Sequence, residues 1–159
     1  LSEECAPEYS YVFKDMALLE QILDLGRHDA RPRADLVYAR QIMDFISYFF
    51  EESFEIVDEY PAEAAADANE ILKRYLEGYD HSDDNEQWFN KIREMAVELG
   101  YAAKPKDFKK NPDDYKGHVC HVSTVVRMAL MGRAQSPDVW TIQQIMGEEL
   151  VRNRIERCL

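Results

Sequence analysis

The sequence contains few cysteines and no long apolar run, and each shortage excludes a class of protein. Three cysteines stand far apart among 159 residues and form no CxxC pair. Such an odd, scattered set indicates neither a disulfide framework nor a zinc knuckle. No run approaches the roughly 18 apolar residues of a membrane span, and the opening LSEECAPEYS lacks the regions of a secretory signal. We therefore expect a soluble, cytoplasmic protein with reduced thiols.

The common catalytic signatures are also missing. The sequence has no P-loop, no GxGxxG after a strand, no GxSxG and no HExxH, which excludes the nucleotide-binding and hydrolytic sites that carry these motifs. The carboxylate cluster in DHSDDN is better explained as a solvated helix start, because acidic side chains favour the positive end of a helix. The sequence therefore offers no candidate catalytic residue.

One short stretch, HVCH, has the side chains of a metal site. His118 and His121 are spaced to share one face of a helix, with Cys120 between them. A structural zinc site needs about four ligands, and no further ligand pair is evident. We therefore expect partly exposed structural histidines, a buried Cys120 and no metal. A metal-dependent helical enzyme is the weaker alternative.

Acidic residues are in excess, and they are unevenly distributed. The net charge of −12 argues by itself against a nucleic-acid binder, because lysine and arginine supply most of the affinity for phosphates. Residues 1–100 carry 9 basic and 24 acidic side chains, a net of −15, whereas residues 101–159 carry 10 and 7, a net of +3. Residues 104–133 alone have 7 basic and 3 acidic side chains, a net of +4. The sequence therefore predicts a local basic face there.

Apolar residues recur with helical spacing along the chain, and no stretch alternates as a half-buried strand would. This pattern predicts an all-α fold of about seven helices in two small subdomains, residues 1–60 and residues 61–159. The expected helices span residues 14–25, 33–57, 61–79, 83–99, 118–131, 137–146 and 148–158. Between them, residues 101–117 contain two prolines and five lysines and are expected to form an exposed loop with at most one short turn.

Within these helices, side-chain spacing predicts which residues face the core. The inward-facing residues of two successive helices are expected to be Ile71, Leu72, Tyr75 and Tyr79, followed by Trp88, Ile92, Met95 and Leu99. Gly26 and Gly100 stand where helix ends favour glycine. Ser82 or Asp83 is the expected N-cap of the second of the two helices.

The stretch RMALMGRAQSPDVW, residues 127–140, joins two helical patterns through a short corner. Gly132 is placed to end one helix, Ser136 to cap the next, and Pro137 to occupy its first position. These roles can be purely architectural. A helix start also offers unpaired N–H groups and a positive dipole end, which suit a phosphate or the acceptor atoms of a base. Arg127 and Arg133 flank the corner.

A second basic segment lies in the acidic part of the chain. Residues 26–40, GRHDARPRADLVYAR, contain Arg27, Arg31, Arg33 and Arg40 against two aspartates. The ordinary interpretation is a solvated loop that pairs with neighbouring carboxylates. The functional interpretation is contact with a polyanion backbone.

With these residues in view, the sequence resembles the C-terminal end of bacterial glutamyl-tRNA synthetases, which are glutamate–tRNA ligases. The family pattern is an Arg, small apolar residues, a Gly, a short turn, Ser or Thr before Pro, an apolar helix ending in Gly-(Lys/Glu)-Glu, and an Arg-rich helix. Residues 127–155 match it without gaps. Residues 31–52 resemble the PRKD stretch of some members, while the insertion-like KPKDFKKNPDDYKGHVCH departs from the short form.

This resemblance implies tRNA-Glu as a partner and anticodon recognition as the function. The family's catalytic HIGH and KMSKS motifs are absent, so ATP, Mg²⁺ and the active site would belong to an upstream catalytic domain and the chain itself would hold no cofactor. Residues 1–60 would join that domain to the anticodon-binding residues 61–159. Leu1 would then fall inside the parent enzyme, and neither DNA nor a membrane is an expected partner.

The resemblance also implies a set of contact residues. Matching the family pattern residue by residue, the anticodon contacts would be Arg127, Ser136, Pro137 and Val139. Here Ser replaces the commoner Thr, and Val the commoner Leu. Supporting phosphate contacts are expected from Arg133, Lys109, Lys110, Lys116, Arg31 and Arg33. The alternative from a different class is an acidic helical protein–protein interaction module without RNA binding.

Overall fold

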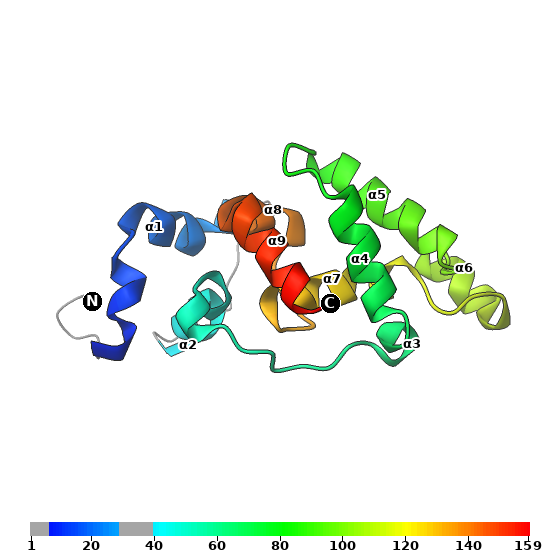
Figure 1. The fold of residues 1–159 in the computed structure, drawn as a ribbon. Coiled ribbons are helices and arrows are strands. Elements are labelled where there is room, and N and C mark those ends of the chain that lie inside the picture. Colours follow the sequence, from blue (N-terminus) through cyan, green and yellow to red (C-terminus); the bar gives the residue numbers. More distant parts are fainter. Residues whose placement is uncertain (1–6, 29–39) are drawn as a thin grey trace. The chain divides into compact units, whose positions relative to one another are not determined.

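The computed structural model describes residues 7–28 and 40–159, and every regular element among them is a helix (Figure 1). This confirms the predicted all-α class. The chain divides into two compact units, Leu1–Glu55 and Ile56–Leu159, called unit 1 and unit 2 below. No helix in the described part of the chain is long and apolar enough to cross a membrane.

Unit 1 begins with the 3₁₀ helix η1 (Pro7–Phe13) and the helix α1 (Met16–Asp24). Asp15 caps α1, because its Oδ1 accepts the Leu18 N–H at 2.9 Å. Leu19 and Ile22 are the buried residues of α1, and Gly26 follows it with a φ of 75°. The predicted helix over residues 14–25 is confirmed, as is its end at a glycine in a left-handed conformation.

The long helix predicted over residues 33–57 is wrong in its described part. Helix α2 (Arg40–Ile46) gives way to two 3₁₀ turns, η2 (Ser47–Phe49) and η3 (Glu51–Ser53), with Phe50 extended between them. The tighter turns bury the rings of Phe45, Tyr48 and Phe49 against one another, and the Ser53 hydroxyl donates to the Ser47 carbonyl at 2.9 Å. Aromatic packing therefore overrides helical propensity here. Residues 29–39, which include Arg31 and Arg33, lie outside the described residues.

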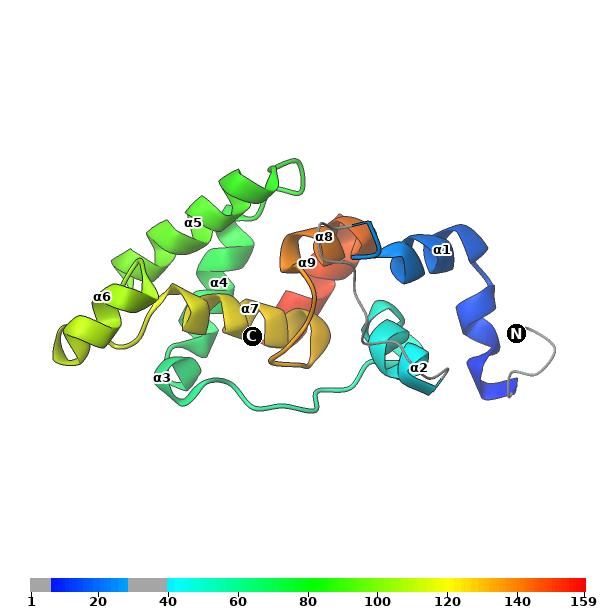
Figure 2. The ribbon, with the colours of Figure 1, turned by 180° about the vertical axis from the view of Figure 1, so that it is seen from behind.

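Unit 2 is built around one buried helix, α7 (Val119–Met131). The other helices of unit 2 are α3 (Ala62–Ala65), α4 (Ala68–Gly78), α5 (Asn85–Glu98), α6 (Pro105–Lys110), α8 (Val139–Met146) and α9 (Glu148–Arg157). Helix α7 packs against α3, α4, α5 and α9 (Figure 2). Its Val122, Val125, Val126 and Leu130 side chains are fully buried. Any segment that contacts the ends of α7 is therefore held on a rigid support.

The predicted faces of α4 and α5 are correct, whereas two boundaries are not. Ile71, Leu72, Tyr75 and Tyr79 are all buried, as are Trp88, Ile92 and Met95, whereas Leu99 is half-buried. The single helix predicted over residues 61–79 is interrupted between α3 and α4. The N-cap of α5 is Asp84, which exchanges hydrogen bonds with Gln87. Neither Ser82 nor Asp83 is the cap as predicted, and Ser82 instead donates its N–H and its hydroxyl to Asp80.

The predicted loop over residues 101–117 contains more helix than expected. Helix α6 starts at Pro105, and a 3₁₀ turn, η4 (Pro112–Asp114), follows it. Each begins on a proline, where the missing N–H costs no hydrogen bond. The segment is closed at its base, because Ala102 N–H donates to Gly117 O at 3.0 Å and Val119 N–H donates to Ala102 O at 2.9 Å. Residues 103–116 are therefore anchored at both ends to the start of α7.

A chain of buried hydrogen bonds joins three helices of unit 2. Trp88 Nε1–H on α5 donates to the Tyr75 hydroxyl on α4 at 3.2 Å. That hydroxyl donates in turn to Gln143 Oε1 on α8. Gln143 is 1% exposed, and its Nε2 has no hydrogen-bond partner among the described residues. The polar groups at the centre of this contact therefore depend on Tyr75.

Candidate nucleic-acid interface

The corner between α7 and α8 is the candidate interface, and its first half folds as predicted. Helix α7 ends at Gly132, which has a φ of 68° and donates its N–H to Met128 O at 2.7 Å. Only glycine adopts this left-handed conformation without a steric cost. Residues 133–138 then form a short loop before α8.

The second half of the corner differs from the prediction. Asp138, not Ser136, caps α8, and its Oδ2 accepts both the N–H and the hydroxyl of Thr141 at 2.9 and 2.8 Å. Ser136 instead donates its hydroxyl to Pro137 O at 2.8 Å, and Pro137 precedes the helix. A carboxylate thus already occupies the helix start. The expectation that this end offers an unoccupied anion site is therefore wrong.

Arg127 points from α7 into the corner. Its Nη1–H donates to Ala134 O at 3.1 Å, and this carbonyl is its only hydrogen-bond partner among the described residues. The Nε–H is buried without a partner in that part of the chain. Burial lowers the pKa of the guanidinium, whereas Cys120 and Asp138 raise it. An arginine remains charged under these conditions, so the corner holds a half-buried cation with unused donors.

The other predicted anticodon contacts differ in accessibility. Val139 is 3% exposed and packs inside unit 2, so a base cannot lie against it as expected without a rearrangement. Ser136 and Pro137 are half-buried. Arg133 is half-buried as well, and no described side chain pairs with it. The corner therefore presents two guanidinium groups and a polar loop, whereas Val139 is buried.

The predicted lysine contacts are separated from the corner. Lys109 and Lys110 are exposed in the last turn of α6 and form no ion pair with a described residue. Lys116 is not available in the same way, because its Nζ is 2.7 Å from Asp67 Oδ2. The 13 residues of α7, about 20 Å of helix, separate the start of α7, next to this segment, from the corner. The cations therefore form two groups and not one continuous basic face.

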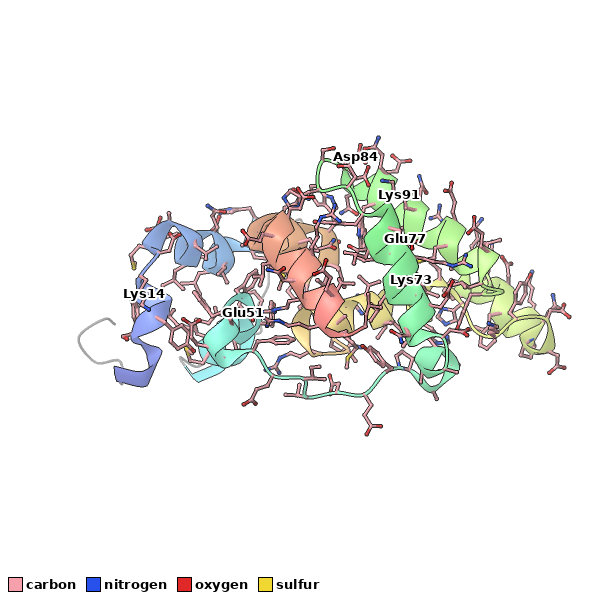
Figure 3. All side chains as sticks on the ribbon, in the orientation of Figure 1. Lys14, Glu51, Lys73, Glu77, Asp84 and Lys91 are labelled. Atoms are coloured by element: carbon pink, nitrogen blue, oxygen red, sulfur yellow. The ribbon has the colours of Figure 1, made fainter. Side chains whose placement is uncertain are left out.

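The largely acidic groove between α4 and α5 is a poor site for a polyanion. It has a volume of about 540 Å³ and contains five acidic and three basic side chains. Arg74 is paired with Glu70 at 2.6 Å and with Glu98 at 3.1 Å, and Lys91 with Asp83 at 2.5 Å. Figure 3 shows Lys73 and Glu77 on α4 and Lys91 on α5. The groove has more acidic than basic side chains, so it offers no excess positive charge to phosphates.

The two histidines of HVCH form the N-terminal cap of α7. His118 Nδ1 accepts the Cys120 N–H at 3.2 Å, and His121 Nδ1 accepts the His118 N–H at 3.4 Å. The ring centroids are 3.9 Å apart. Both Nδ1 atoms are thus occupied as acceptors, and the described residues contain no group of three or more potential metal ligands. Cys120 is exposed, so the expectation that it is buried is wrong.

This cap predicts a pH dependence of stability. Burial, and next the neighbouring His121, lower the pKa of His118 below its ordinary value of 6.5, while Lys109 lowers it and Glu63 raises it. The unfolded chain therefore binds the proton more readily than the folded chain. We expect the stabilising contribution of neutral His118 to be present above pH 6.5, the ordinary pKa, and to be lost as the pH falls below it through the lowered pKa of the folded state.

Thermal unfolding of the wild type and of His118→Ser across this pH range measures the effect. Serine keeps a capping oxygen and does not titrate there. We expect the variant to lose less stability than the wild type on acidification. Equal losses would show that His118 does not carry the dependence.

Two residues of the corner were not singled out from the sequence. Asp138 could have been found, because aspartate just before an apolar helical run is a preferred N-cap residue. Asp58 could not, because it contacts the corner from a segment 76 residues away, where its Oδ2 accepts the Ala134 N–H at 2.7 Å. No local pattern marks such a contact.

Comparison with known proteins finds relatives over most of the chain. A glutamate–tRNA ligase of Acetivibrio thermocellus is 61% identical over 140 residues, which cover 87% of this chain and 26% of the ligase. The chain is homologous to part of glutamate–tRNA ligase. The ligase of Clostridium perfringens strain SM101 is 37% identical over 95% of this chain and 28% of its own length. That of Clostridium beijerinckii is 35% identical over 97% of this chain and 29% of its own length.

These relatives confirm the predicted resemblance to glutamate–tRNA ligases. The chain corresponds to a small part of an aminoacyl-tRNA synthetase and spans 26 to 29% of the length of these three relatives. No family model matches it, and no solved structure matches it.

Proposed function

We propose that the chain is the anticodon-binding helical part of a bacterial glutamate–tRNA ligase. Its RNA partner is tRNA-Glu, and its protein partner is the upstream catalytic domain of the same polypeptide. Catalysis with ATP and Mg²⁺ belongs to that domain, and this chain holds no cofactor. Its homology to glutamate–tRNA ligases supports the proposal.

The proposed RNA contacts lie at the corner between α7 and α8. Arg127 and Arg133 flank Gly132, and the first makes one hydrogen bond to the described protein while the second makes none. Guanidinium groups with unused N–H donors suit base edges and phosphates. Because Asp138 occupies the start of α8, recognition relies on these side chains and the polar loop, and not on the helix dipole.

The described surface gives less support to a protein-interaction module. Its exposed large apolar side chains are Met16, Ile56, Val57, Val97 and Leu159. Single exposed apolar side chains are ordinary on a protein surface, and these five are few for the broad apolar patch that a protein partner uses.

The proposal is tested by titrating the chain with a fluorescent anticodon stem–loop of tRNA-Glu at several salt concentrations. We expect saturable binding that weakens as salt rises, with a log–log slope of about −0.7 for each single-strand phosphate neutralised. The variant Lys109→Gln/Lys110→Gln is expected to lower the magnitude of that slope without changing preference among RNA sequences. No saturable binding even at low salt would overturn the proposal.

A further inference from the structure

The corner is tied to the first residues of unit 2. Residues 56–58 lie just after the boundary between the two units, far in sequence from the corner itself. Val57 N–H and Asp58 N–H both donate to Gly132 O, at 2.9 and 3.2 Å. The carbonyl at the end of α7 thus has two backbone partners from one extended segment. This segment fixes where the loop leaves α7.

Asp58 adds a side-chain contact to the same loop. Its Oδ2 accepts the Ala134 N–H at 2.7 Å, a length typical of a hydrogen bond to an ionised group. Ala134 O accepts Nη1–H of Arg127 at 3.1 Å. One loop residue is therefore held by a carboxylate on its amide side and by a guanidinium on its carbonyl side.

In this arrangement Asp58 does not form an ion pair with Arg127. No salt bridge joins Asp58 to Arg127 or Arg133, although all three residues are described. An exposed carboxylate beside an RNA site repels phosphates, so its presence weakens non-specific attraction. The hydrogen bond from Ala134 to Asp58 offsets this repulsion, because a loop that is fixed before binding loses less entropy on binding.

We infer that Asp58 is a positioning residue of the proposed RNA site: it holds Ala134, and through the Ala134 carbonyl it sets the direction of the Arg127 guanidinium. The inference rests on the proposed function. By holding the loop, Asp58 affects which anticodon is preferred. It affects the overall attraction to RNA only through its charge.

Three variants separate positioning from charge. Asp58→Ala removes both the acceptor and the charge, whereas Asp58→Asn keeps an oxygen that can accept the Ala134 N–H. Glu59→Ala removes the same charge from the next residue, which is also exposed. Each is titrated with the tRNA-Glu stem–loop and with the same RNA carrying changed anticodon bases. Amide hydrogen exchange at Ala134 reports on the loop without RNA.

We expect Asp58→Ala to lower discrimination between the two RNAs by about fivefold to tenfold and to speed exchange at Ala134. Asp58→Asn and Glu59→Ala should keep the discrimination of the wild type. If Asp58→Ala discriminates as the wild type does, the positioning role is wrong and the proposed function stands. If the wild type shows no discrimination, the proposed function fails and this inference fails with it.

Discussion

Replacing Arg127 with alanine is expected to weaken binding of the tRNA-Glu anticodon stem–loop by about tenfold to a hundredfold. An arginine that contacts a base is worth about 1–3 kcal/mol, and this guanidinium already lies in the corner with most of its donors unused. Fluorescence anisotropy titration at fixed salt measures the change. Unchanged affinity would remove Arg127 from the site.

Two comparisons distinguish lost recognition from lost structure. Arg127→Lys keeps the positive charge but not the planar fork of donors, so it should recover the salt slope without recovering anticodon preference. Arg133→Ala removes a nearby cation that no described residue pairs, and should reduce affinity for all RNA sequences equally. Because Arg127 also bonds to Ala134 O, the folding of each variant is checked by circular dichroism before titration.

The second large effect concerns stability and needs no RNA. Tyr75→Phe is expected to lower the free energy of unfolding of unit 2 by about 2–4 kcal/mol, because it leaves buried polar groups without partners. Trp88 Nε1–H and Gln143 Oε1 both bond to the Tyr75 hydroxyl. Burial raises the pKa of this phenol, so its hydroxyl keeps its proton and donates at neutral pH.

Urea unfolding followed by tryptophan fluorescence measures this effect, since Trp88 and Trp140 both lie in unit 2. The double variant Tyr75→Phe/Gln143→Met provides the control. Methionine is close to glutamine in size and has no strong polar groups to satisfy, so the double variant should recover part of the loss. A single variant as stable as the wild type would show that the buried chain contributes nothing.

The sequence predicted best where one physical effect decides the structure. Helix α7 and the end of α1 follow apolar spacing closed by glycine, and the buried faces of α4 and α5 follow their 3.6-residue period. The 3₁₀ turns after α2 could not be predicted, because they depend on how aromatic rings pack in three dimensions. Residues 29–39, which include Arg31 and Arg33, are outside the described structure, and their predicted role remains a prediction.

The site was predicted only in outline. The sequence located the corner and its two arginines, but it assigned the helix cap to Ser136 because serine before proline is a common start. Asp138 is the cap instead, because it accepts two hydrogen bonds from Thr141. The accessibility of Val139 and the pairing of Lys116 with Asp67 depend on residues far away in sequence. Contacts of that kind leave no local signal.

One comparison tests directly whether the corner recognises anticodon bases. The wild-type chain is titrated at a single salt concentration with two anticodon stem–loops that differ only in their anticodon bases. The tRNA-Glu stem–loop is expected to bind at least about tenfold more tightly than the other RNA. Phosphate contacts alone would bind the two RNAs equally, so the difference would come from contacts to the bases. Equal affinities for the two RNAs would contradict the account.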